Sequence, residues 1–135
     1  MMSKQEIIEA IHQDWGDLPQ SKICISILDY LLNTSESIYS YITYGSLRKI
    51  VGNEYDDSTI LITVQYLCGE RTNLLNANFE IIDDNENHFD ITHDDLNLAR
   101  KTGQLFHPDN GELIHDFEEK VYIYFQPSQI VKNIT

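Results

Sequence analysis

The sequence has few basic residues. Nine Lys and Arg stand against 22 Asp and Glu in a chain of 135 residues, which gives a formal net charge of -13. A charge of this sign and size repels phosphate backbones and anionic membranes at long range. We therefore expect no membrane partner. A nucleic acid is an alternative that the charge disfavours unless the few cations gather on one face.

Long apolar runs are also absent, and cysteines are few. No run approaches the ~18 apolar residues of a membrane span, and the polar start Met1–Glu6 does not resemble a secretory signal. These features predict a cytoplasmic protein. Cys24 and Cys68 lie inside apolar helical patterns, which favours buried thiols, although spacing alone leaves a disulfide open.

Motifs of active sites and metal centres are missing as well. The sequence has no Gly-x-Ser-x-Gly, no phosphate-binding glycine loop, no Cys-x-x-Cys and no histidine pair at i, i+4. Asp83, Asn85, Asn87 and Asp94 have the oxygen spacing of a calcium loop, but His88 stands where that loop needs glycine. A solvated hairpin turn is the better interpretation. We expect no enzymatic activity, no cofactor and no metal.

The first third of the chain contains two amphipathic helical patterns. Ser3 and Glu6 form a capping box that predicts a helix from the start of the chain to Trp15. A wide apolar stripe from Ile23 to Leu32 predicts a second helix at the centre of the core. Residues 38–43 alternate and are rich in β-branched and aromatic side chains, which predicts a short strand or an extended lead-in to the next helix.

Two further helices follow in close succession. Thr43 is expected to cap a short helix that stops at Gly52, and Ser58 to cap a longer helix that ends near Gly69. The inward face predicted for the longer helix consists of Ile60, Leu61, Val64, Leu67 and Cys68.

The second half of the chain alternates strands and turns. Residues 78–82 and 88–92 predict a β-hairpin around an Asp- and Asn-rich turn. Thr92 with Asp95 predicts the cap of a helix closed by Gly103. An Asn110-Gly111 turn follows, and then a strand at 120–125 that Pro127 stops.

This order of elements resembles the winged helix-turn-helix superfamily. The resemblance rests on the helix at 44–51, the Gly52 turn, the helix at 58–68 and the hairpin at 79–91. It implies an α+β fold in one domain, 1–135, with a winged-helix core at 20–103 and an added C-terminal turn and strand region at 104–135. In many winged-helix proteins the second helix enters the DNA major groove, whereas others bind proteins or dimerise.

The sequence departs from the DNA-binding pattern of that superfamily. The helix expected to contact bases has no Lys or Arg, and the wing turn carries Asp83, Asp84 and Glu86. Our preferred hypothesis is a non-enzymatic adaptor or regulatory subunit that binds a protein partner or forms a homodimer. The alternative is a DNA-binding transcription regulator, and a third interpretation is an acidic nucleic-acid mimic or inhibitor.

Each hypothesis has its own candidate residues. The nucleic-acid candidates are the cations near the helix pair and two polar residues of its second helix, namely Arg48, Lys49, Thr63, Gln65 and Arg71. The candidates for a protein interface are the aromatic residues of the last strand, Tyr122, Tyr124 and Phe125, because aromatic residues are enriched in interfaces. The alternation of that strand fits ordinary packing under a helix equally well.

Overall fold

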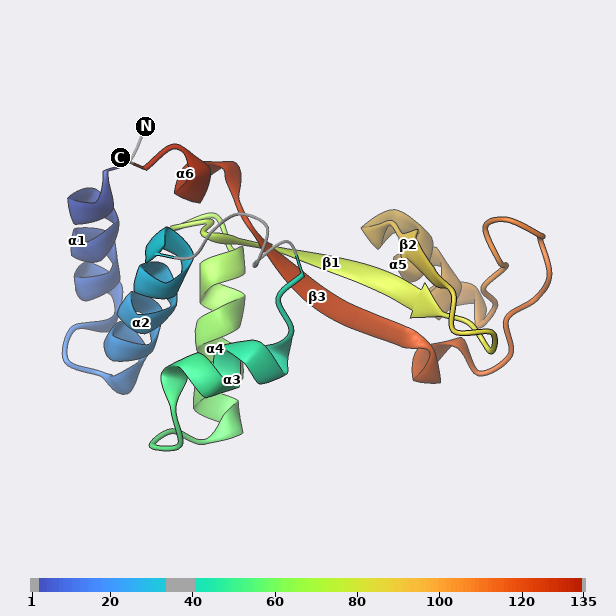
Figure 1. Ribbon diagram of the computed structural model, residues 1–135, viewed down its shortest axis with the longest axis horizontal. Helices are drawn as coiled ribbons and strands as arrows, with labels where there is room; N and C mark the ends of the chain where they lie inside the picture. Colours follow the sequence, from blue (N-terminus) through green and yellow to red (C-terminus); the bar gives the residue numbers. More distant parts are fainter. Residues whose placement is uncertain (1–2, 34–40, 135) are drawn as a thin grey trace. The chain divides into compact units, whose positions relative to one another are not determined.

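The computed structural model describes residues 3–33 and 41–134 (Figure 1). This part of the chain has the predicted α+β composition, with six α-helices and one three-stranded antiparallel sheet. Two compact units divide the chain: unit 1 comprises Met1–Asn76 and Phe125–Thr135, and unit 2 comprises Ala77–Tyr124. None of the described helices is long and apolar enough to cross a bilayer.

Unit 1 contains four helices of the first half of the chain: α1 (Lys4–Trp15), α2 (Pro19–Asn33), α3 (Tyr44–Val51) and α4 (Asp57–Cys68). The predicted caps of α1 and α3 are confirmed. The Ser3 hydroxyl accepts a hydrogen bond from the backbone N–H of Glu6 at 3.2 Å, and the Thr43 hydroxyl accepts one from the N–H of Ser46 at 3.1 Å. Each satisfies an amide at the start of its helix that has no partner within the helix.

The N-terminal cap of helix α4 lies two residues earlier than predicted. Its cap is Asp56, whose carboxylate accepts a hydrogen bond from the N–H of Thr59 at 2.8 Å. The prediction of Ser58 as the cap is therefore wrong, because Ser58 already lies in the first turn. The sequence offers several cap-forming side chains in a row, and only the tertiary course of the chain selects one. The helix ends at Gly69, as predicted.

The core of unit 1 is built around α2, which contacts α1, α3 and α4. This central position confirms the prediction from its apolar stripe. The largest side chains that are fully buried there come from all four helices: Ile7, Ile11, Ile23, Ile27, Leu28, Leu31, Leu47, Ile60 and Leu67.

The end of the chain completes unit 1. Ile42 pairs antiparallel with Phe125 of β3 (Val121–Pro127) through two backbone hydrogen bonds of 2.9 and 2.7 Å. This pairing agrees with the predicted extended lead-in, of which residues 38–40 lie outside the described residues. Helix α6 (Gln129–Lys132) follows and buries Val131. The last residues therefore pack into unit 1, which differs from the predicted C-terminal extension at 104–135.

Unit 2 is built on the predicted hairpin. Strands β1 (Leu75–Ile82) and β2 (His88–Ile91) pair antiparallel, and the order in the sheet is β2-β1-β3. The Asp83 carboxylate closes the turn by accepting hydrogen bonds from the N–H groups of Asn85 and Asn87, both at 2.9 Å. The turn is thus closed by its own Asp83 side chain, as the hairpin interpretation predicts.

Helix α5 (His93–Thr102) lies against this sheet and has the predicted ends. Thr92 caps it by accepting from the N–H of Asp95 at 3.1 Å, and Gly103 ends it at a φ of +78°, a conformation that favours glycine. The core of unit 2 consists of Ile81, Ile91, Leu96, Ala99, Leu105, Ile114 and Phe117. The predicted boundary between residues 103 and 104 therefore falls inside this unit.

Candidate functional site

Helix α4 exposes large apolar side chains. Leu61 is 47% exposed and Ile62 is 50% exposed, and they lie beside the exposed Ser58 and Gln65. We call these four residues the α4 face. The chain carries no charge between Asp57 and Glu70, so this face is uncharged. The prediction that Leu61 faces inward is wrong.

Thr63, a predicted nucleic-acid candidate, is fully buried. Its hydroxyl donates a hydrogen bond to the carbonyl of Thr59 at 2.7 Å. Together with Ile60, Val64 and Leu67, it forms the inward face at helical spacing i, i+3, i+4 and i+7. Its prediction as an exposed base-contacting residue is therefore wrong.

Arg48 connects helix α3 to the turn before α4. Its Nη1 donates to the carbonyl of Tyr55 at 2.5 Å, and its Nε lies 3.7 Å from Oδ1 of Asp57. The same carboxylate oxygen accepts a hydrogen bond from the Tyr44 hydroxyl at 2.7 Å. The Arg48 charge is thus compensated within the protein, while its neighbour Lys49 is exposed.

Arg71 is also engaged within unit 1. Its Nε donates to Oδ2 of Asp14 at 2.8 Å, and its Nη2 donates to the Gln13 side chain at 2.9 Å. The Tyr66 hydroxyl donates to the same Asp14 oxygen at 2.5 Å, and the Tyr66 ring packs edge-to-face on Trp15. The hydrogen bond from Tyr66 lowers the pKa of the Asp14 carboxyl below its ordinary value, and the hydrogen bond from Arg71 adds a smaller effect in the same direction.

Two of the three predicted nucleic-acid cations, Arg48 and Arg71, are therefore paired with carboxylates of the same unit. Of the remaining candidates, Lys49 on α3 and Gln65 on α4 are exposed. These surroundings leave few cationic groups for phosphates.

The aromatic candidates of β3 do not form one surface. Tyr122 is exposed, whereas Tyr124 and Phe125 are buried. The Tyr124 hydroxyl donates a hydrogen bond to the Asp90 carboxylate at 3.0 Å. Burial is the main cause that raises the pKa of Tyr124, and this hydrogen bond raises it further. Consecutive residues are both buried because Tyr124 packs in unit 2 and Phe125 in unit 1. The prediction of a shared interface through these three residues is therefore wrong for Tyr124 and Phe125.

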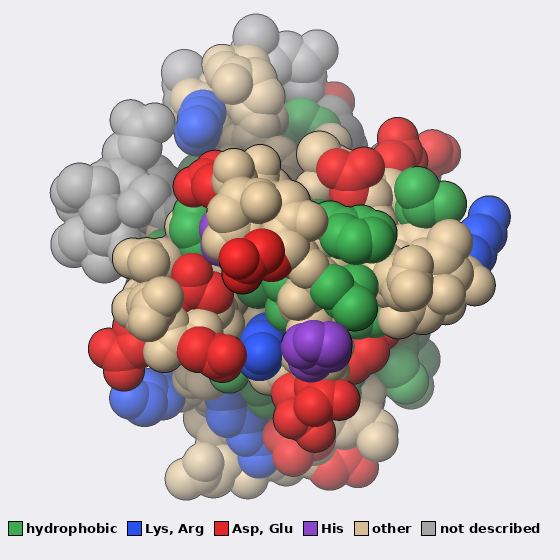
Figure 2. Space-filling view, turned by 90° about the vertical axis from the view of Figure 1, so that its right-hand side faces the viewer, with side chains coloured by type: hydrophobic (Ala, Val, Ile, Leu, Met, Phe, Trp, Pro, Cys, Tyr) green, Lys and Arg blue, Asp and Glu red, His purple; other side chains and the backbone are tan. Residues whose placement is uncertain are grey.

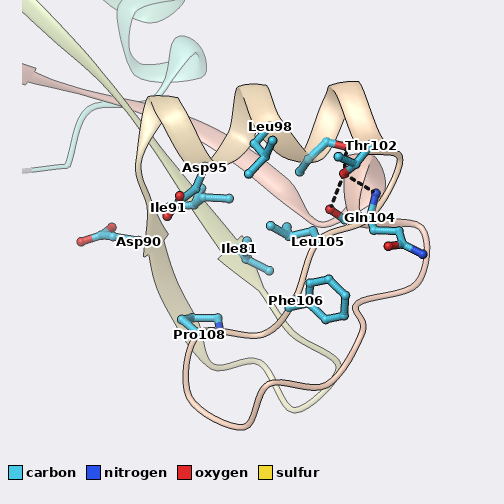
Figure 3. A pocket seen from close by; sticks show the side chains of 11 residues that line it. Ile81, Asp90, Ile91, Asp95, Leu98, Thr102, Gln104, Leu105, Phe106 and Pro108 are labelled. Atoms are coloured by element: carbon cyan, nitrogen blue, oxygen red, sulfur yellow. Dashed lines mark hydrogen bonds between the residues drawn. The ribbon is translucent and has the colours of Figure 1, made fainter.

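A groove that the sequence did not reveal runs along α5 in unit 2 (Figure 3). It has a volume of about 370 Å³. Its floor is apolar, and its walls are α5 on one side and the segment 104–108 on the other. Leu98 and Phe106 project from these walls with 60% and 55% of their surface exposed.

The two cysteines are free thiols, and both are shielded. Burial raises the pKa of Cys24 to about 12 and that of Cys68 to about 11. Because the thiolate is the nucleophile and the metal ligand, neither group is activated. Within residues 3–33 and 41–134, no group of three or more His, Cys, Asp or Glu is arranged to hold a metal ion.

No protein-family model matches this sequence, and comparisons with curated proteins and with solved structures found no match. Any function proposed for the chain therefore rests on its fold and on the surfaces described above.

Proposed function

We propose that the chain is a non-enzymatic adaptor or regulatory subunit of winged helix-turn-helix architecture that binds another protein through the α4 face. The observation that carries the proposal is the pair Leu61 and Ile62, which are about half exposed on a helix face without charge. Exposed apolar clusters of this kind are typical of protein interaction sites.

The order and pairing of elements support the winged-helix architecture. A short helix α3, a turn at Gly52 and the longer helix α4 are followed by β1, and β3 lies next to β1 in the sheet. The pairing of Ile42 with Phe125 adds a short extended segment ahead of α3. In this interpretation the predicted hairpin of β1 and β2 is the wing, and β3 is a third strand beside β1.

The chemistry of the α4 face favours a protein over DNA. Fully burying a Leu or Ile side chain contributes roughly 1.5–3 kcal/mol, so two half-exposed side chains can supply roughly that much together. Base recognition instead needs hydrogen-bonding side chains and several phosphate contacts. The α4 face has only Ser58 and Gln65 for the first purpose, and the nearby Arg48 is held by Asp57.

The charge of the chain favours a different protein over a second copy. Two chains with a formal charge of -13 each repel one another, whereas a neutral or basic partner is not repelled. We therefore expect a heteromeric complex.

Site-specific photocrosslinking tests this function in the cells of origin. A photoreactive amino acid at Gln65 is expected to crosslink to a discrete partner protein, and the same group at the exposed Gln5 of α1 is not. The crosslink should disappear when Leu61 and Ile62 are both changed to Ser. It should persist in Leu18→Ser, which removes an exposed leucine elsewhere in unit 1.

Three results would contradict the proposal. Crosslinks to nucleic acid would favour the DNA-binding alternative, and a crosslink to a second copy of the chain would replace the heteromeric partner by a homodimer. Equal crosslinking from Gln65 and Gln5 would remove the α4 face as the site.

A further inference from the structure

We propose that unit 2 has a binding site of its own, in which the groove along α5 takes an amphipathic protein segment that carries Lys or Arg beside a large apolar side chain. This site shares no residue with the α4 face, and its occupant is defined by the chemistry of the groove.

The interior of the groove is apolar. Ile81, Ile91 and Leu105 form its floor and are buried in the core of unit 2. Leu98 extends from α5 and Phe106 from the facing segment, and both remain more than half exposed (Figure 3). An apolar side chain of a ligand placed between them would cover both. Removing the exposed apolar surface of Leu98 and Phe106 from water favours binding.

The charged groups of the groove are all negative. Asp90 and Asp95 lie at its β2 end, away from Gln104, and none of the lining residues is basic (Figure 3). The Asp90 carboxylate points away from the groove (Figure 3) and accepts a hydrogen bond from the Tyr124 hydroxyl at 3.0 Å, which leaves Asp95 as the carboxylate that faces a ligand. A cation that follows the apolar side chain of a ligand would meet the Asp95 carboxylate at the edge of the groove.

The charge of the whole unit has the same sign. Residues 77–124 contain 12 acidic and three basic residues, a difference of nine that accounts for most of the net charge of the chain. Two of the three basic residues are already paired: Nε of Arg100 lies 2.9 Å from Oε1 of Glu118, and Nζ of Lys120 lies 3.3 Å from Oδ1 of Asp84. On the face shown in Figure 2, acidic side chains border exposed hydrophobic ones. Such a field attracts cationic segments and raises their association rate.

The second wall of the groove is preorganised. Segment 105–107 pairs with 112–114 through Ile114 N–H to Leu105 C=O at 2.8 Å and His107 N–H to Glu112 C=O at 2.7 Å. The His107 ring packs edge-to-face on Phe89 and lies 3.4 Å from the Asp83 carboxylate. The backbone at Phe106 is therefore fixed before binding, which reduces the entropy lost when a ligand binds.

The dimensions fit part of a protein segment. The volume of about 370 Å³ is near the lower end of the ~300–1,000 Å³ found for ligand sites. That is room for one or two large side chains, and Leu98 and Phe106 extend the apolar contact beyond the groove. This combination of a shallow pocket and exposed apolar rims is typical of helix-in-groove recognition.

The test uses the full-length protein and a synthetic peptide of Leu and Lys, about 18 residues long, arranged as an amphipathic helix of about five turns. Isotope-labelled protein titrated with this peptide at physiological salt should show its largest amide shift changes along α5 and residues 104–108. The affinity should fall about tenfold in Leu98→Ser and in Phe106→Ser. Ile123→Ser, which removes an exposed residue outside the groove, should bind as the wild type does.

A second pair of variants tests the charge. Asp95→Asn removes a groove carboxylate, and Asp94→Asn removes its neighbour in the same first turn of α5, which does not line the groove. The affinity should fall severalfold in the first variant and much less in the second, since salt screens distant charges over about 8 Å. A peptide with Glu in place of Lys should not bind.

Shift changes spread over the acidic surface, or equal affinity for the two Asp variants and for Leu98→Ser, would overturn the proposal and indicate general electrostatic adhesion. The variant with both Leu61 and Ile62 changed to Ser should bind this peptide normally. Failure of the groove proposal is therefore distinguishable from failure of the α4 proposal.

Discussion

The hydrogen bond from Tyr66 to Asp14 joins the end of α4 to the end of α1, so we expect Tyr66→Phe to destabilise unit 1. The substitution removes only the hydroxyl and keeps the ring on Trp15, where the ring centroids lie 5.2 Å apart. Hydrogen bonds to charged groups contribute ~1.5–3 kcal/mol. The Asp14 side chain is 29% exposed, so the lower end applies and the expected loss is about 1.5 kcal/mol.

The effect of Tyr66→Phe should depend on pH. The bonds from Tyr66 and Arg71 lower the folded-state pKa of Asp14, so this carboxylate stabilises the fold above its unfolded pKa. That contribution is lost as the pH falls through the lowered folded-state pKa, below about 4. The difference between the wild type and Tyr66→Phe is therefore largest near neutral pH and shrinks in acid.

Urea unfolding followed by tryptophan fluorescence measures this effect, because Trp15 is the only tryptophan and lies beside Tyr66. Tyr30→Phe on α2 is a matched control, expected to change the free energy of unfolding by less than about 0.5 kcal/mol. A double-mutant cycle with Asp14→Asn should show coupling of about 1 kcal/mol. Wild-type stability in Tyr66→Phe, or fully additive effects in the cycle, would refute the reasoning.

Three further predictions concern the N-terminal cap of α4, the core of unit 2 and the buried thiol of Cys24. Asp56→Ala should lower the urea midpoint of unit 1 whereas Ser58→Ala should not, since only Asp56 accepts the N–H of Thr59; equal midpoints would contradict this assignment. Leu96→Ala should destabilise unit 2 by ~2–5 kcal/mol, visible as faster amide exchange over residues 77–124, because Leu96 is 1% exposed. The Cys24 thiol, with its pKa raised to about 12 by burial, should not react with a disulfide reagent at pH 8 until urea unfolds the chain, and rapid native reaction would show that it is accessible.

Features set by short stretches of sequence were predictable. The caps at Ser3, Thr43 and Thr92 depend on residues within one helical turn, and the structure has all three. The hairpin around Asp83 likewise depends on a turn that its own side chain closes. The hydrogen bonds that define these caps and this turn join residues within a few positions of one another, so the local sequence is enough to indicate them.

Features set by distant contacts were not predictable. Tyr124 and Phe125 are adjacent in sequence, yet the bond to Asp90 and the pairing with Ile42 bury them in different units. Nothing in the strand pattern identifies these partners.

The face of α4 lies between these two cases. Ile60, Leu61 and Ile62 are consecutive, and residues of a helix turn by about 100° each, so all three cannot face one core. The sequence therefore indicates that at least one of these three side chains is exposed. Which ones are exposed depends on where α2 packs, and Thr63 takes the buried position that a polar residue would not suggest.

The claim that α4 binds protein and not DNA is tested most directly by fluorescence anisotropy of labelled duplexes at low salt, with random DNA and with DNA upstream of the protein's own gene. We expect no saturable binding at protein concentrations up to roughly 10⁻⁵ M, where non-specific DNA binders already bind. Saturable binding that weakens steeply with salt and is lost when Arg48 and Lys49 are both changed to Ala would contradict the claim. A changed sequence preference in Gln65→Ala would then assign α4 to base recognition.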